Sequence, residues 1–291
     1  MKVAIYCKRV PDEAVVSVLI LVKELMSKNV QLYMNASFSD FLKSKDISGD
    51  FIIGSSLEDV DTAPDILISI GGDGTMLDTI TAIGDSEIPI IGFNTGRLGF
   101  LANNAKEEAK QIVGMLLKGD YELEQRSLLS LETDDKLFGK NNFALNELTV
   151  HKKDSASMMT IHTYINDEYL NSYWADGLIL ATPTGSTAYS LSCGGPILIP
   201  QSKSFVINPI APHNLSARPI IVSDDVEIKL RIEGREDEFL ATLDSRTRTI
   251  SNATDLKVVK SKFCINLVKF EGQNFYNTIR NKLLWGMDKR N

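Results

Sequence analysis

The sequence predicts an α/β N-terminal domain built on a parallel sheet, a β-rich C-terminal domain, and a final helix that packs back on the first domain. Three observations lead to this fold class. The first ~120 residues alternate short apolar runs with amphipathic stretches, which is typical of a parallel sheet covered by helices. From about residue 121, short β-rich segments follow one another between turn residues. The end returns to helical spacing, with Phe275, Ile279 and Leu283 four residues apart.

The elements of the first domain can be assigned in order from their apolar spacing. Short apolar runs bounded by Gly, Pro or Asp are interpreted as strands at residues 3–7, 31–34, 66–70 and 88–93. Residues 14–26 have apolar side chains at helical spacing, and residues 106–118 are predicted to form a helix that ends at Gly119. Residues 40–61 are mostly polar and are predicted to form a loop.

The second domain is assigned from a series of short β-rich segments. They cover residues 127–132, 147–151, 159–165, 177–182, 220–222, 226–232, 239–243 and 257–267. We therefore expect one domain over residues 1–120, to which 268–291 return, and a second over residues 121–267.

Composition limits the classes of protein that fit this chain. The 291 residues are 43% hydrophobic and carry a net charge of −7, which suits a globular protein and argues against a general nucleic-acid binder. No apolar run approaches the ~20 residues that span a membrane, and residues 1–6 resemble a strand more than a signal peptide. The three cysteines are far apart without CxxC spacing, so we expect a reducing cytoplasm without a disulfide framework or zinc site, and no residue is assigned as a metal ligand.

The most informative motif is Gly71-Gly72-Asp73-Gly74-Thr75, which directly follows the apolar run 66–70. A strand that leads through glycines into a helix N-terminus presents backbone N–H groups to a phosphate. A carboxylate in such a turn repels an anion, so Asp73 has a purpose if it takes a proton or holds a metal. The alternative is a tight turn in which Asp73 only caps the helix.

Two further stretches are polar in a way that suits a ligand. Residues 182–189 are rich in hydroxyl groups that can bind ribose or phosphate oxygens, although they would equally suit a capped helix start. Asn146-Glu147 precedes an apolar run, and such a pair can bind two hydroxyl groups. Asp176-Gly177, taken alone, is a turn dipeptide.

Taken in order along the chain, these motifs closely resemble the NAD kinase family. The resemblance runs from about residue 2 to residue 285, essentially the whole chain. The glycine-rich element is shared with diacylglycerol kinases and resembles phosphofructokinases, whereas the 182–189 stretch with the Asn-Glu pair is more specific. The motifs that carry it are Gly71–Thr75, Asn94–Leu101, Asn146–Leu148, Asp176-Gly177, Thr182–Tyr189, Gly194–Pro196, Pro212-His213 and Arg218-Pro219.

The resemblance implies a role for each matched residue. Asp73 would be the general base that takes the proton of the adenosine 2′ hydroxyl of NAD as this oxygen attacks the γ-phosphate of ATP; a purely magnesium-binding role is the alternative. Asn146 and Glu147 would bind the adenosine ribose or adenine, and Asp176 would lie on the nicotinamide side. The diphosphate would be bound by Gly72, Gly74 and Thr75, and the pocket would be lined by Thr187, Ala188, Tyr189 and Ser192.

The same resemblance implies substrates and partners. ATP and NAD would be the substrates, with Mg²⁺ or another divalent cation bound by the nucleotide phosphates. The first domain would bind nucleotide, and the second would bind NAD and build a homodimer or homotetramer. We expect a cytoplasmic enzyme without a nucleic-acid or membrane partner. A related lipid or sugar kinase and a non-catalytic NAD(P) sensor are the alternatives.

Some residues depart from the family pattern or leave their role open. The family usually has Asp-Gly near position 244, where this chain has Asp244-Ser245, so the loop is less free to adopt positive φ. His213 is interpreted as structural, with a substrate contact as the alternative, and His151 and His162 as structural. Arg97 could pair with a phosphate or be a surface charge. A Walker-type lysine loop does not occur.

Overall fold

The computed structural model describes residues 1–54, 63–96, 99–153, 158–235 and 237–285, and it divides the chain into two compact units. The first contains the described residues of Met1–Gln125 and Ile265–Asn291, and the second is Arg126–Cys264. Both boundaries fall inside strands, namely β7 (Glu122–Glu132) and β18 (Leu256–Lys269). The first unit is α/β and the second is β-rich, which confirms the predicted fold class.

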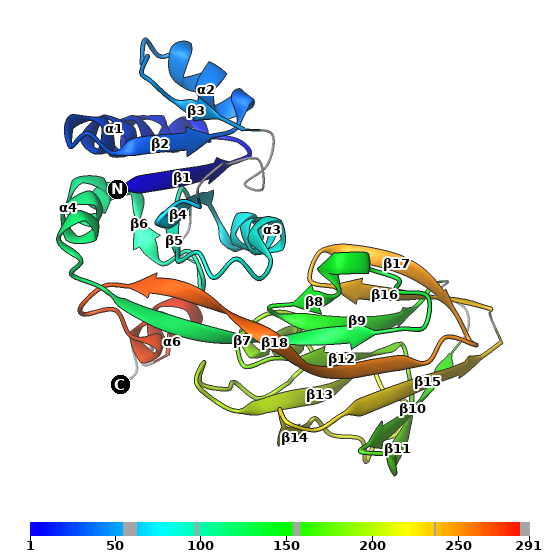
Figure 1. The fold of residues 1–291 in the computed structure, drawn as a ribbon. Helices are drawn as coiled ribbons and strands as arrows, with labels where there is room; N and C mark the ends of the chain where they lie inside the picture. Colours follow the sequence, from blue (N-terminus) through cyan, green and yellow to red (C-terminus); the bar gives the residue numbers. More distant parts are fainter. Residues whose placement is uncertain (55–62, 97–98, 154–157, 236, 286–291) are drawn as a thin grey trace. The chain divides into compact units, whose positions relative to one another are not determined.

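A parallel sheet forms the centre of the first unit (Figure 1). Its strand order is β18-β5-β4-β1-β2-β3, with β6 beside β5, and these pairings are parallel. The strands are β1 (Lys2–Cys7), β2 (Gln31–Met34), β3 (Ile52–Ile53), β4 (Ile66–Gly71), β5 (Ile90–Asn94) and β6 (Asn104–Ala105).

Helices cover both faces of this sheet because its strands are apolar on both sides. Alternate residues of β4, such as Ile68 and Ile70, join a core with α1 (Val15–Ser27), α2 (Ala36–Lys43) and α4 (Ala109–Lys118). The other face meets α3 (Asp73–Ile83), where the hydroxyls of Ser69 and Thr79 lie 2.8 Å apart. Short 3₁₀ turns at Asp12–Ala14 and Lys106–Glu108 precede α1 and α4.

The last helix, α6 (Phe275–Leu283), belongs to the first unit as predicted. Asn274 caps it by accepting a hydrogen bond from the N–H of Asn277. Just before the cap, Gln273 donates to the side chain of Asn104 at 2.8 Å, and within the helix Ile279 is buried.

The second unit consists of two packed sheets (Figure 1). One is antiparallel with the order β14-β13-β12-β9-β16-β17. The other contains β11, β10, β15 and the start of β18, and β7 pairs with β8. The strands are β8 (Phe143–Ala144), β9 (Glu147–Lys152), β10 (Met159–Ile165), β11 (Glu168–Ala175), β12 (Gly177–Ala181), β13 (Ser204–Ile210), β14 (Ile220–Ser223), β15 (Ile228–Gly234), β16 (Glu238–Leu243) and β17 (Arg246–Ser251).

Strand alternation decides which face of the six-stranded sheet carries polar groups. Leu148 and Val150 of β9 point into the core between the two sheets. Ile179 and Ala181 of β12 face the other way and pack against Leu198, from the segment that follows β12. That segment contains a 3₁₀ turn (Gly185–Thr187) and the short helix α5 (Tyr189–Ser192).

The predicted loop at 40–61 is wrong in its first part. Residues 40–43 complete α2, and β3 lies further along the segment. Polarity misled the prediction because α2 buries only one face, with Phe38 and Leu42. Its N-cap is Asn35, whose side chain accepts a hydrogen bond from the N–H of Phe38. Residues 55–61 lie outside the described part of the chain. No helix among the described residues has the length and apolar character to cross a membrane.

Candidate functional site

The predicted site residues fall into two groups, one in each unit. The first group is the turn between β4 and α3 and contains Gly72, Asp73, Gly74 and Thr75. The second lies on the outer face and at the strand ends of the six-stranded sheet and contains Asn146, Glu147, Asp176, Thr187, Ala188, Tyr189 and Ser192.

In the first group, glycines leave the backbone of the turn accessible to a ligand. A Cβ atom at Gly71 would lie 2.2 Å from the hydroxyl oxygen of Thr75, so only glycine fits at the end of β4. Gly72 and Gly74 are exposed, and a Cβ atom at either would meet nothing within 4 Å. The first N–H groups of a helix have no partner within the helix, and the open positions at Gly72 and Gly74 leave room for an anion to approach them.

Asp73 does not cap α3, because the residue at the cap is Gly72 and no side chain bonds there. Its carboxylate instead accepts hydrogen bonds from three consecutive backbone N–H groups, those of Phe100 (2.9 Å), Leu101 (3.0 Å) and Ala102 (3.0 Å). A Cβ atom at Gly99 would lie 1.9 Å from a carboxylate oxygen of Asp73. A carboxylate has about four lone-pair positions, so one remains for a ligand.

The stretch that begins at Asn94 is the partner of Asp73 and explains that motif. The Asn94 side chain donates to the carbonyl of Ala102 at 2.9 Å and accepts from the N–H of Gly96 at 2.7 Å. These bonds fold the end of β5 into the loop that Asp73 binds. Arg97, a candidate for phosphate binding, lies outside the described residues.

In the second group, the Asn146-Glu147 turn is organised by a residue whose role the sequence left open. The carboxylate of Asp244 accepts from the N–H groups of Leu145 (3.0 Å), Asn146 (2.8 Å) and Glu147 (3.2 Å). Asp244 itself has φ of +53°, so the residue with positive φ in this loop is the aspartate. The only signal in the sequence was the Asp-Ser pair that follows the strand β16.

Burial and charge set the protonation state of Glu147. Its side chain is buried, and its Oε2 atom has no hydrogen-bond partner among the described residues. Burial, followed by the nearby charge of Asp244, raises the pKa of Glu147 to about 8, against a hydrogen bond from the N–H of Tyr189. At neutral pH the acid is therefore protonated and can both donate and accept.

Tyr189 lies beside this pair and stacks on His151, with ring centroids 5.8 Å apart and planes at 21°. Burial lowers the pKa of His151, which favours the neutral imidazole, while Asp176 opposes the shift. The Tyr189 side chain is 38% exposed, so it offers part of its ring to a ligand.

Several hydroxyls of the 182–189 stretch are used within the chain. Thr182 donates to the carbonyl of Leu145 and accepts from the N–H of Gly185, while Ser186 donates to the carbonyl of Pro183. Thr187 is half-buried and donates to the carbonyl of Thr184. These bonds give the stretch its shape, although no side chain caps its 3₁₀ turn or α5. Ala188 is half-buried and Ser192 is exposed.

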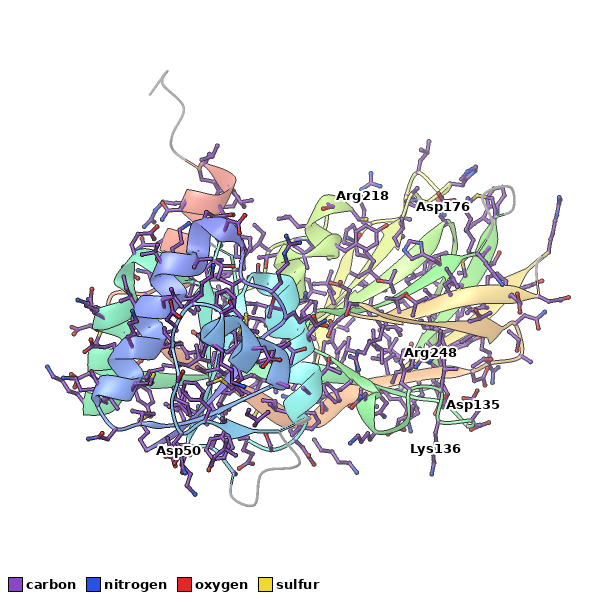
Figure 2. The ribbon with its side chains drawn as sticks, turned by 90° about the horizontal axis from the view of Figure 1, so that it is seen from above. Asp50, Asp135, Lys136, Asp176, Arg218 and Arg248 are labelled. Carbon is purple, nitrogen blue, oxygen red and sulfur yellow. The ribbon has the colours of Figure 1, made fainter. Side chains whose placement is uncertain are left out.

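Asp176 lies where β11 ends and β12 begins, and its carboxylate pairs with Lys152 at 2.6 Å. Figure 2 shows Asp176 and Arg218 at one edge of the second unit. The N–H of His213 donates to the carbonyl of Trp174, and the two rings are 4.8 Å apart, which suits a structural histidine. No group of three or more potential metal ligands occurs among the described residues.

The two sets of motifs match the two domains of one family. Residues 3–121 match the ATP-NAD kinase N-terminal domain and residues 145–270 the ATP-NAD kinase C-terminal domain. An NAD kinase of Cytophaga hutchinsonii is 50% identical over 92% of each chain, and one of Flavobacterium johnsoniae is 47% identical over the whole of both. The chain belongs to the NAD kinase family.

Solved NAD kinase family structures share the fold. Yeast NADH kinase, complexed with NADH, has a TM-score of 0.87 at 24% identity, with 98% of this chain and 88% of that chain covered. An NAD kinase of Archaeoglobus fulgidus, in complex with ATP, has a TM-score of 0.74 at 24% identity, with 96% and 99% covered. The family assignment makes this chain a kinase.

Proposed function

We propose that this kinase transfers the γ-phosphate of ATP to the adenosine 2′ hydroxyl of NAD and so forms NADP. The observation that carries the proposal is the half-exposed carboxylate of Asp73, at the start of helix α3. It is fixed by the N–H groups of residues 100–102 and keeps one lone pair for a ligand. Asp73 would take the hydroxyl proton, a role that contributes about 10²–10⁴-fold in rate. Phosphoryl transfer otherwise depends on positioning and on charge neutralisation.

The second unit supplies groups suited to the NAD substrate. Protonated Glu147 can donate to one ligand atom and accept from another, and Asn146 offers an amide beside it. Tyr189 would pack on a base or ribose, and Asp176 would bind the nicotinamide side. Gly72, Gly74 and Thr75 of the first unit would donate to phosphate oxygens, and Thr187, Ala188 and Ser192 would line the dinucleotide pocket.

ATP and NAD are the proposed substrates, in line with the names of the curated relatives and the ATP and NADH in the two solved structures. Mg²⁺ is proposed as the cofactor. It prefers oxygen ligands and binds largely through nucleotide phosphates, so it needs few groups from the protein. The Asp73 carboxylate, with its remaining lone pair, could serve as one such oxygen ligand. A metal-binding role for Asp73 is the alternative to its role as the base.

We also propose that the protein is cytoplasmic, has no nucleic-acid or membrane partner, and forms a homodimer or homotetramer through the second unit. Large apolar side chains on that unit support this assembly: Trp174 is 51% exposed, Ile221 on the edge strand β14 is 48% exposed, and Leu215 is 89% exposed. Sedimentation is the test, and a stable, active monomer would exclude the assembly.

The test of the reaction is NADP formation from NAD, ATP and Mg²⁺ by the purified protein, followed with an NADP-specific dehydrogenase. Asp73→Asn should abolish NADP formation and leave NAD affinity within a few-fold. Asp78→Asn is the matched control, because Asp78 lies on the same helix but pairs with Lys8 at the surface. Its turnover should stay near that of the wild type.

The outcome separates the alternatives. A folded wild type that binds NAD but forms no NADP would favour a sensor or a different phosphoryl acceptor. Full turnover in Asp73→Asn would exclude Asp73 as the base.

A further inference from the structure

One buried carboxylate, that of Asp244, binds the backbone on which the Asn146-Glu147 pair sits. Its two oxygens accept three consecutive N–H groups, those of residues 145–147, at 2.8–3.2 Å. The contact is reciprocal, because the N–H of Asp244 donates to the carbonyl of Glu147 at 3.0 Å. A single side chain thus fixes the direction in which both members of the pair leave the main chain.

The opposite edge of the same turn is bound by Thr182. Its N–H donates to the carbonyl of Asn146 at 2.9 Å, and its hydroxyl donates to the carbonyl of Leu145. Gly185 comes so close that a Cβ atom there would lie 2.0 Å from the carbonyl oxygen of Asn146. The 182–185 stretch therefore leaves the turn no room to move, provided that Asp244 holds its other edge.

This arrangement is costly for the fold. The Asp244 side chain is 3% exposed, and its nearest cation, that of Arg246, lies 3.8 Å away. A non-glycine residue at positive φ and a buried acid each lower stability. The acid of Asp244 also lies near the buried Glu147, where its charge disfavours ionisation of Glu147. A feature that lowers the stability of a fold in this way is expected where the geometry serves a ligand.

We propose that Asp244 is a positioning residue for the Asn146-Glu147 pair, and that it acts on NAD binding through the backbone of 145–147. The proposal rests on the proposed function, which assigns the pair to the NAD substrate. An amide at 244 cannot replace the acid, because its NH₂ group would face a backbone N–H, donor against donor. At least one of the three hydrogen bonds is then lost, and the turn can shift.

The experiment compares Asp244→Asn with Asp224→Asn. Asp224 is an acid of the same unit with a similarly buried side chain, 4% exposed against 3% for Asp244; it follows the edge strand β14 and pairs with Lys260 at 2.7 Å. Asp244→Asn should raise the KM and the Kd for NAD about tenfold, the order expected for a disrupted buried hydrogen bond, with the KM for ATP unchanged within twofold. Asp224→Asn should lower thermal stability while leaving both KM values near those of the wild type.

A pH profile separates positioning from general destabilisation. The charged or titratable groups around Glu147 are Asp244, Tyr189 and Cys193. Loss of the Asp244 charge should move the alkaline limb of the NAD affinity profile to lower pH, and Glu147→Gln should remove that limb. Destabilisation alone would move neither.

Each result has a distinct meaning. Equal effects of Asp244→Asn on the NAD and ATP constants, or effects matched by Asp224→Asn, would overturn the positioning role. The Kd for NAD is measured by calorimetry for every variant in the absence of ATP. A wild type that forms no NADP therefore counts against the proposed function, while the comparison of NAD affinities still decides the role of Asp244.

Discussion

In both units a buried or half-buried aspartate fixes the backbone of a neighbouring loop. In each, a single aspartate accepts hydrogen bonds from three consecutive backbone N–H groups: Asp73 binds residues 100–102, and Asp244 binds residues 145–147. A glycine lies close to each loop: a Cβ atom at Gly99 would collide with the Asp73 carboxylate, and one at Gly185 would collide with the carbonyl of Asn146 on the edge of the turn opposite Asp244. A carboxylate can order a loop that has no sheet or helix partners of its own.

The difference lies in what surrounds each acid. Asp73 is half-exposed and lies between two exposed positions of the turn, Gly72 and Gly74, so its last lone pair can reach a ligand. The Asp244 side chain is buried, and burial raises its pKa against the hydrogen bonds from Leu145 and Asn146 and the charge of Arg246. The first arrangement leaves the acid available for chemistry, whereas the second uses an acid only to place its neighbours.

The largest expected effect comes from displacing the Asp73 carboxylate by a substitution at another residue. Gly99→Ala places a methyl group 1.9 Å from the carboxylate oxygen, so the carboxylate or the loop must move. We expect turnover to fall by about 10²-fold or more, the loss typical of a misplaced reacting group, with NAD affinity little changed. Gly114→Ala is the control: its Cβ meets nothing within 4 Å in helix α4, and it should be stabilising. Wild-type turnover in Gly99→Ala would show that Asp73 needs no such placement.

The matching change in the second unit is Gly185→Ala. The added methyl group meets the carbonyl of Asn146, which is backbone and cannot rotate away. We expect a loss of about 1–3 kcal/mol in the free energy of unfolding, as for other overpacked sites, together with weaker NAD binding. Urea denaturation and calorimetry give the two values. Stability equal to that of the wild type would mean that the turn is looser than the contacts indicate.

A third prediction concerns the pH dependence of stability that the second unit contributes. The folded pKa of Glu147 is raised to about 8 from 4.5, so the folded state holds a proton that the unfolded chain releases. This contribution to stability is present in full below pH 4.5 and is lost as pH rises through 8, with a limiting slope of about 1.4 kcal/mol per pH unit. Glu147→Gln should lack this slope, so its stability relative to the wild type should rise between pH 5 and pH 8. Parallel curves in urea denaturation would contradict the assignment.

The smallest effect is expected for Ser245→Gly, which restores the Asp-Gly pair usual in the family. The positive φ lies on Asp244 and not on the residue after it, so the glycine relieves no strain. The change in the free energy of unfolding should stay within about 1 kcal/mol, the ordinary entropic cost of a glycine. A clear gain in stability would show that the serine is strained.

Much of the fold could be predicted from the sequence because its signals are local. The run 66–70 and the glycines after it specify a strand, a turn and a helix start, and the structure has β4 and α3 there. The polar segment from residue 40 was assigned wrongly, because an amphipathic helix with a side-chain cap has few apolar residues to count.

The candidate site could be predicted only in part. Asp73 and the Asn146-Glu147 pair stand in recognisable motifs, but their hydrogen-bond partners lie 27–29 and 97–99 residues away along the chain. The role of Asp244 depends on such a distant contact and on burial, and neither has a local signature. For the same reason the sequence could not show that Glu147 is protonated at neutral pH, since this state follows from packing.

The discontinuity of the first unit has a consequence for biosynthesis. Its sheet needs the end of β18, where Leu267 pairs with Ile90 of β5, and its last helix is α6. Residues 1–125 therefore emerge from the ribosome before their final strand. The first unit cannot complete its sheet until the whole of the second unit, residues 126–264, has been synthesised. The continuous second unit can close first, against the usual N-terminal-first order. During that delay the edge of β5 that pairs with β18 in the folded protein lacks this partner and is open to other strands or to chaperones.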